Sequence, residues 1–169
     1  MAEIKNLILD KNQILQKIKR IAYQIYEENF QQGELVFAGI QGAGYTLAQM
    51  IRNDFEEISG LTSKLCMISL DKFQPVQGEI NIDIEIAQIR DKTVIVVDDV
   101  LNTGRTMAYS LSPFLTIRIS KLQTAVLVDR NHKSFPVSAD FVGYTLSTTL
   151  QEHITVVLEN NEDFGVYLS

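Results

Sequence analysis

The sequence has few of the residues that build disulfide scaffolds, metal centres or nucleic-acid surfaces. Cys66 is the only cysteine among 169 residues, which excludes an internal disulfide and fits a reducing compartment, with the thiol expected in the core. The two histidines, His132 and His153, do not have the spacing of a metal-ligand pair. Lysine and arginine number 15 against 21 acidic residues. The net charge of −6 argues against broad nucleic-acid binding but leaves room for a local basic patch.

Long apolar runs are also missing. No stretch approaches the roughly 20 apolar residues that a membrane helix needs. The N-terminus, MAEIKNLILD, lacks the basic start and apolar run of a signal peptide. We therefore expect a cytoplasmic protein with no membrane partner. The length suits a single domain, residues 1–169, with a sizeable core.

Helical and strand patterns alternate along the chain. Helices are predicted at 10–29, 45–57 and about 106–116; strands at 35–40, 64–70, 93–98 and 122–128, with short tail strands at 141–142 and 154–158. Residues 71–85 contain Pro75 and Gly78 before alternating isoleucines, which indicates a loop leading into an exposed two-stranded ribbon or an edge strand. This alternation predicts an α/β fold with a mainly parallel sheet.

Two adjacent acids follow a strand that is expected to be buried, in the stretch VIVVDDVLNTGRT at residues 94–106. Asp98 and Asp99 thus lie at a carboxyl end of the sheet, where open α/β sheets place their ligands. Carboxylates repel phosphate, and they suit hydroxyl groups or a divalent cation. The less specific interpretation is a capped turn with solvated acids.

The residues after the acids suit phosphate. Asn102, Thr103, Gly104, Arg105 and Thr106 open a helix, whose first N–H groups and positive dipole end attract anions. Gly104 permits a close approach to the backbone, and the threonines add hydroxyl donors. The arginine could pair with the phosphate or pack on the surface. Phosphate on one side, with a diol and Mg²⁺ on the other, describes a ribose 5-phosphate that carries a metal-bound group.

The 13 residues strongly resemble the phosphoribosyl pyrophosphate (PRPP) signature of type I phosphoribosyltransferases. LVFAGIQGAGYTLAQMI, residues 35–51, is similar to the family's first strand, pyrophosphate loop and following helix. LQTAVLVDRNHKSFPVSADFVGYTLSTT and the N-terminal LDKNQILQKIKRIAYQIYEEN resemble one subgroup, the pyrimidine operon attenuation regulators that also have uracil phosphoribosyltransferase activity.

This resemblance implies a type I phosphoribosyltransferase fold, with a mainly parallel central sheet flanked by helices and a small hood. It implies that residues 102–106 bind the 5-phosphate, and that Asp98 and Asp99 hold the ribose hydroxyls and order Mg²⁺, mostly indirectly. Asp129 and Arg130 would meet the base and pyrophosphate, unless they form a surface ion pair.

The remaining site residues that the resemblance implies lie in two loops. The pyrophosphate loop corresponds to Gln41, Gly42, Ala43 and Gly44, and the mobile loop supplies one cation, Lys72, which could equally be a solvated surface lysine. His132, beside the Asp129–Arg130 pair, is a minor candidate.

The sequence departs from the family pattern in three places. Ala43 stands where the subgroup usually has an arginine, which removes a charge-assisted contact. Residues 71–85 form a short, acidic mobile loop, which predicts poor exclusion of water. On the face matching the RNA-binding helix, Lys19 and Arg20 are present, but Tyr23 replaces an expected histidine beside Glu27 and Glu28.

Three functions are compatible with these observations. The leading one is a Mg²⁺-dependent phosphoribosyltransferase that makes uridine monophosphate from uracil and PRPP. The second is a catalytically weak or inactive nucleotide-sensing regulator of pyrimidine genes that binds RNA. The third is a binding or assembly protein that keeps the fold for structure alone. The resemblance also implies a homodimer or higher homo-oligomer, with residues 79–86 as one contact.

Overall fold

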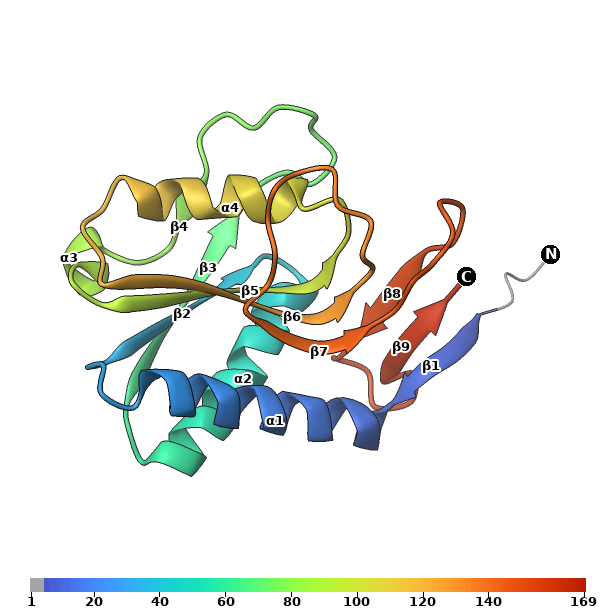
Figure 1. Ribbon diagram of the computed structural model, residues 1–169, viewed down its shortest axis with the longest axis horizontal. Helices are drawn as coiled ribbons and strands as arrows, with labels where there is room; N and C mark the ends of the chain where they lie inside the picture. Colours follow the sequence, from blue (N-terminus) through green and yellow to red (C-terminus); the bar gives the residue numbers. More distant parts are fainter. Residues whose placement is uncertain (1–4) are drawn as a thin grey trace.

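A six-stranded sheet forms the centre of the computed structural model, which describes residues 5–169 (Figure 1). Its strand order is β4–β3–β2–β5–β6–β7, parallel except for β4, which pairs antiparallel with β3. The strands are β2 (Leu35–Ile40), β3 (Ser63–Ser69), β4 (Asn81–Ile82), β5 (Thr93–Leu101), β6 (Lys121–Asp129) and β7 (Phe141–Thr145). This confirms the predicted α/β class with a mainly parallel sheet.

Helices cover both faces of this sheet. Figure 1 shows α1 (Lys11–Asn29) and α2 (Ala43–Ser59) on one face and α4 (Arg105–Leu115) on the other, with the short α3 (Ile86–Ile89) beside the sheet. Successive residues of β2 are buried on opposite faces: Phe37 joins the core under α1 and α2, whereas Val36 and Ala38 join the core under α4. Strands buried on both faces have continuous apolar sequences, as a parallel sheet requires.

A second, three-stranded antiparallel sheet forms the hood. Its order is β1 (Asn6–Asp10), β9 (Gly165–Leu168) and β8 (Ile154–Val157), so that it joins the two ends of the described chain (Figure 1). β1 and β9 were not among the predicted strands. Each is short, and each pairs with a segment that is distant in sequence, so that local periodicity carries little signal for either.

Helix α1 begins where its sequence predicts. The Asp10 carboxylate accepts a hydrogen bond from Gln13 N at 2.9 Å, and the Gln13 side chain accepts one from Asp10 N, which together form a capping box. The isoleucines at helical spacing, Ile14, Ile18, Ile21 and Ile25, are all buried. The amphipathic pattern of this segment therefore becomes the packed face of the helix.

One predicted boundary was wrong. Strand β5 continues to Leu101 and does not end at residue 98, because Val100 and Leu101 still pair with Val128 and Asp129 of β6. Of the two possibilities for residues 71–85, the structure adopts the edge strand: the loop leads into β4, a two-residue strand that pairs with β3. Within residues 5–169, none of the helices combines the length and the apolar character that crossing a membrane would require.

Candidate active site

A cavity of about 180 Å³ lies at the carboxyl ends of the parallel strands. Asp98 and Asp99 of β5, the loop from Asn102 to Gly104, and Thr106 at the start of α4 line it. Lys72 reaches the cavity from the segment after β3, and Ile154 reaches it from the hood. The structure therefore brings the two acids, the phosphate-type loop and the predicted mobile-loop cation to one place, where open α/β sheets bind ligands.

The two acids are buried to different degrees. The Asp98 side chain is 5% exposed and that of Asp99 is 20% exposed. Asp98 Oδ1 accepts a hydrogen bond from Asp99 N at 2.9 Å. Burial raises the pKa of the Asp98 carboxyl strongly, and the negative charge of Asp99 raises it further. A buried carboxylate in this position needs a cation or hydrogen-bond donors on its ligand.

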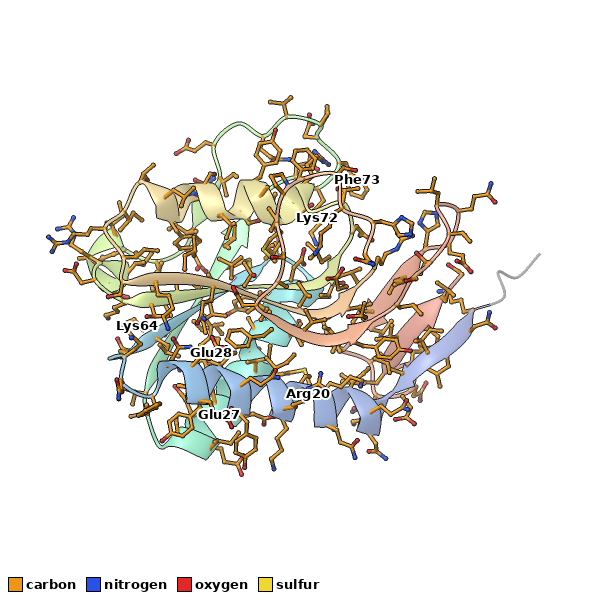
Figure 2. The ribbon with its side chains drawn as sticks, viewed as in Figure 1. Arg20, Glu27, Glu28, Lys64, Lys72 and Phe73 are labelled. Atoms are coloured by element: carbon orange, nitrogen blue, oxygen red, sulfur yellow. The ribbon has the colours of Figure 1, made fainter. Side chains whose placement is uncertain are left out.

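Lys72 supplies a positive charge to this pair. Its Nζ lies 3.2 Å from Asp98 Oδ1 and 3.9 Å from Asp99 Oδ1, and the side chain is 39% exposed. Lys72 is therefore both exposed to solvent and paired with the two acids. Figure 2 shows Lys72 and Phe73 together near one end of α4, while Lys64 lies toward the opposite end of the sheet.

The phosphate-type loop is held in shape by hydrogen bonds from a second segment, residues 134–135. Gly104 has a φ of +87°, which glycine adopts without strain, and α4 begins at the next residue. Thr103 O accepts hydrogen bonds from Ser134 N at 2.8 Å and Phe135 N at 3.0 Å. The loop is thus braced from outside, and the first N–H groups of α4 have no acceptor within the helix. This arrangement suits an anion.

The side chain of Arg105 does not face this loop. Its Nη2 donates to Lys72 O at 2.8 Å, and its Nη1 donates to Gln74 O. The guanidinium holds the segment that carries Lys72. Pairing of Arg105 with phosphate stays a prediction.

The predicted pyrophosphate loop lies against the same acids. Gly42 has a φ of +93°, α2 begins at Ala43, and Gln41 N donates to Ile68 O of β3 at 2.9 Å. A Cβ on Gly44 would lie 2.9 Å from Asp98 Oδ1 and 3.0 Å from Val97 O. The glycine at this position thus lets the start of α2 approach the end of β5 closely. The methyl group of Ala43 places no charge here.

Arg130 connects the central sheet with the segment before the hood strand β8. Its guanidinium donates to Thr148 Oγ1, Asn102 Oδ1, Thr149 O and Glu152 O, at 2.9, 3.0, 3.1 and 2.7 Å. Asp129 pairs with Lys133 at 3.6 Å and accepts a hydrogen bond from Asn131 N at 2.8 Å. Asp129 and Arg130 therefore do not form the alternative surface ion pair with each other.

The two histidines have different contacts. His132 Nε2 contacts Thr148 O, close to the partners of Arg130. The backbone of His153 pairs with that of Ser169, at 2.8 Å and 3.0 Å. Neither histidine lines the cavity.

The donor set fits Mg²⁺ only in part. Two adjacent carboxylates are present, and within residues 5–169 no group of three or more His, Cys, Asp or Glu side chains could hold a metal by itself. Mg²⁺ typically keeps several waters and takes one or two protein carboxylates together with substrate phosphates. Asp98 and Asp99 would therefore hold such an ion only with a substrate that brings oxygens of its own, in line with the indirect role that the sequence predicts.

Four apolar residues of the cavity were not predicted: Val100, Leu101, Met107 and Ile154. Three of them belong to β5 or α4, next to the predicted acids. Ile154 belongs to β8, a strand of the hood. In the sequence it is part of an ordinary strand pattern, ITVVL, which gives no sign of a binding site. Apolar side chains beside a phosphate-type loop provide a surface on which a planar base can pack.

The face of α1 that matches the RNA-binding helix is only partly basic (Figure 2). Arg20 Nη2 donates to the carbonyl groups of Val142 at 2.9 Å and Gly143 at 2.6 Å, which fastens α1 to β7. Glu28 accepts from Gln123 at 2.8 Å, and the neighbouring Glu27 is exposed. Of the two cations on this face, Arg20 is therefore bonded within the fold, whereas Lys19 is exposed.

Comparison with known proteins agrees with this geometry. The model of the phosphoribosyl transferase domain family matches residues 6–161. Curated relatives include "Bifunctional protein PyrR" of Macrococcus caseolyticus, 34% identical over 165 residues, with 94% of this chain and 95% of the relative covered. The protein of the same name from Bacillus pumilus is 37% identical over 169 residues, with 95% and 93% covered.

Solved structures of the same fold come from purine enzymes. A hypoxanthine-guanine phosphoribosyltransferase of Bacillus anthracis superposes with a TM-score of 0.78 at 22% identity, covering 99% of both chains. The hypoxanthine phosphoribosyltransferase of Trypanosoma cruzi gives 0.77 at 17% identity, covering 96% and 95%. At these identities the likeness shows the fold alone. The family match and the curated relatives show that this chain belongs to the phosphoribosyltransferase family, in its PyrR branch.

Proposed function

We propose that this protein, acting as a single phosphoribosyltransferase domain, transfers the ribose 5-phosphate of PRPP to a nucleobase, with uracil as the first candidate. The observation that carries the proposal is the cavity in which Asp98 and Asp99 meet the loop from Asn102 to Thr106. One side of this cavity suits ribose hydroxyls and the other suits phosphate. Uracil is the first candidate because the sequence resembles the subgroup with uracil phosphoribosyltransferase activity.

In this proposal, each part of the site binds one part of PRPP. The N–H groups at the start of α4 and the hydroxyl groups of Thr103 and Thr106 bind the 5-phosphate. Asp98 and Asp99 accept hydrogen bonds from the ribose hydroxyls. The turn at Gly42 and Ala43 holds the pyrophosphate through backbone N–H groups. Bound Mg²⁺ would neutralise charge on the pyrophosphate as it leaves.

The chemical step needs little acid–base catalysis by the protein. The bond from C1 to the pyrophosphate oxygen breaks, a nitrogen of the base bonds to C1, and that nitrogen loses its proton. The contribution of the chain is to position both reactants and to stabilise the charge that develops on pyrophosphate. Arg130 takes part by fixing the segment around Thr148 and Glu152 near the base, and His132 lies beside that segment.

A ³¹P NMR spectrum tests the proposal. PRPP and Mg²⁺ are incubated with the protein, and uracil, hypoxanthine, guanine and xanthine are then added in turn. Free pyrophosphate together with a nucleoside monophosphate signal is the expected result, and it names the base. Asp98→Asn with Asp99→Asn should abolish both PRPP binding and turnover. Full turnover in that double variant would refute the assignment of the site.

The alternative function is a regulator that senses nucleotide and binds RNA. It is supported by the resemblance of α1 to the subgroup's first helix and by relatives whose name describes them as bifunctional. The acidic Glu27 and the internally bonded Arg20 weaken it. A gel-shift assay with pyrimidine-operon leader RNA against a scrambled RNA distinguishes the two functions, and we expect no preference.

We also propose a cytoplasmic homodimer. Ile86 is 52% exposed and lies in an apolar groove with Ile80, Ile82, Pro113 and Ile117, in the region that the sequence assigns to a subunit contact. Light scattering is expected to give twice the chain mass. A monomer at all concentrations would exclude the contact.

A further inference from the structure

Residues 71–78, called the lid below, form a loop that is closed on itself. The Gln77 side chain crosses the loop: its Oε1 accepts from Asp71 N at 3.2 Å, and its Nε2 donates to Asp71 O and, at 3.3 Å, to Gln74 O. Phe73 N also donates to Asp71 Oδ1 at 2.9 Å. The lid thus has a shape of its own before any ligand binds. Because the lid is bonded internally, a hydrogen bond or ion pair from the rest of the protein to one of its residues positions the whole lid.

Two side-chain ties connect the lid with the candidate active site, one made by Arg105 and one by Lys72. Arg105, the first residue of α4, donates from its two terminal nitrogens to Lys72 O and Gln74 O. Lys72 sends its Nζ the other way, to Asp98 and Asp99. Phe73 itself is 96% exposed and makes no hydrophobic anchor. The lid is therefore held by the guanidinium and the ammonium.

The ammonium of Lys72 lies against both carboxylates. The carboxylates of Asp98 and Asp99 are mostly buried and adjacent, so that together they require positive charge nearby. In the part of the chain that the structure describes, Lys72 is their one ion-pair partner within 4.0 Å. A divalent ion brought by the substrate would need the same oxygens.

We propose that Arg105 is a positioning residue that latches the lid to the phosphate-type loop and thereby places Lys72 on the two aspartates, where its ammonium stands in for the cation of the substrate. The role of that cation rests on the proposed function, whereas the latch itself does not. A substrate with its metal must displace the ammonium, and Arg105 keeps the lid beside the site while Lys72 moves.

The competing role for Arg105 is a direct contact with the 5-phosphate. The two roles differ in what a neutral substitution does. Arg105→Gln removes the charge and the forked donor. If Arg105 is a latch, the lid opens more often, but ribose 5-phosphate still binds to the backbone N–H groups. If Arg105 holds phosphate, binding of ribose 5-phosphate weakens.

The first experiment measures both properties in Arg105→Gln, with Arg118→Gln as the matched control, since Arg118 pairs with Asp91 and lies outside the cavity. Chymotrypsin cleavage after Phe73 is followed by mass spectrometry, and binding of ribose 5-phosphate by calorimetry. We expect cleavage about tenfold faster, because two charge-assisted bonds are lost, and an affinity for ribose 5-phosphate within about threefold of the parent. Unchanged cleavage in a folded Arg105→Gln overturns the latch.

A second variant tests the other tie without touching Arg105. Lys72→Met keeps the carbonyl that Arg105 binds and removes the ammonium. Binding of Mn²⁺ in the presence of PRPP, followed by electron paramagnetic resonance, is expected to tighten about tenfold in Lys72→Met and to stay unchanged in Lys64→Met. Equal Mn²⁺ affinity in Lys72→Met and the parent overturns the stand-in role.

These outcomes separate the inference from the proposed function. A parent protein that binds no ribose 5-phosphate and turns over no PRPP refutes the proposed function, while faster lid cleavage in Arg105→Gln still supports the latch. A parent that turns over PRPP while lid cleavage is the same in all variants refutes the latch alone.

Discussion

Asp98 is a residue whose ionised form destabilises the fold. Its carboxyl is buried beside a second carboxyl, and both features raise its pKa. The folded protein therefore holds this proton more tightly than the unfolded chain does. A group of this kind stabilises the fold at pH below its unfolded pKa, and that stabilisation is lost as the pH rises toward the folded value.

The pH dependence of unfolding should reveal this residue. Without divalent ions, the free energy of unfolding should fall as the pH rises from about 4 toward 8, by about 1–3 kcal/mol from Asp98. Asp98→Asn should remove that fall and be the more stable protein at pH 8, with little PRPP-dependent turnover. Urea unfolding at several pH values measures this, and Asp163→Asn, an exposed site, is the control. An identical pH profile in Asp98→Asn would contradict the prediction.

Gly44 should tolerate no side chain. A Cβ there would meet Asp98 Oδ1 and Val97 O at 2.9 and 3.0 Å, and the second of these atoms is a backbone oxygen of the central strand β5. Gly44→Ala should lose about 1–3 kcal/mol of stability and weaken PRPP binding, since it pushes α2 away from the acids. Gly33→Ala, which meets nothing within 4 Å, is the matched control for thermal unfolding. Equal melting temperatures for the two variants would show that α2 can shift freely.

At the scale of elements, the start of α2 is the proposed pyrophosphate loop, and it lacks a charged side chain. Only backbone N–H groups and the helix dipole face an anion there, because the residue at the first helical position is Ala43. Charge-assisted hydrogen bonds contribute roughly twice as much as neutral ones.

Ala43→Arg should therefore strengthen the binding of PRPP. We expect KM for PRPP to fall about tenfold, which corresponds to roughly 1.4 kcal/mol, while the affinity for ribose 5-phosphate, which has no pyrophosphate, stays the same. Ala43→Met adds volume without charge and should leave KM unchanged. A similar effect from both substitutions would assign the gain to packing.

At the scale of the whole molecule, one guanidinium connects the central sheet to the segment that leads into the hood. Arg130 follows β6 directly, and its four acceptors lie in the phosphate-type loop and in residues 148–152. The hood sheet itself joins the two ends of the described chain. The position of Ile154 over the cavity therefore depends on contacts between distant parts of the sequence.

Arg130→Lys should loosen this connection. Lysine keeps the charge but cannot reach four acceptors in a planar fork. We expect KM for the base to rise about tenfold while the affinity for ribose 5-phosphate changes little. Steady-state kinetics with both substrates measures the split, and Arg52→Lys, which contacts Ser63 and Glu56 away from the site, is the control. A loss of phosphate binding instead would assign Arg130 to the PRPP loop.

The sequence predicted those parts of the protein that depend on local pattern. The apolar run before Asp98, the glycine turn at Gly104 and the isoleucine spacing of α1 each specify an element within about a dozen residues, and each was found. The short strands β1 and β9 were missed because their partners lie at the other end of the chain.

The composition and local pattern of this chain determined its fold class, its family and the place where we propose that a ribose 5-phosphate binds. Only the tertiary structure decided what the long cationic side chains do. Lys72 reaches Asp98 across 26 positions in sequence, and Arg105 reaches back 33 positions to Lys72 O. A long, flexible side chain binds whichever groups the folded chain places within its reach, and the spacing of residues in the sequence does not indicate which groups those are.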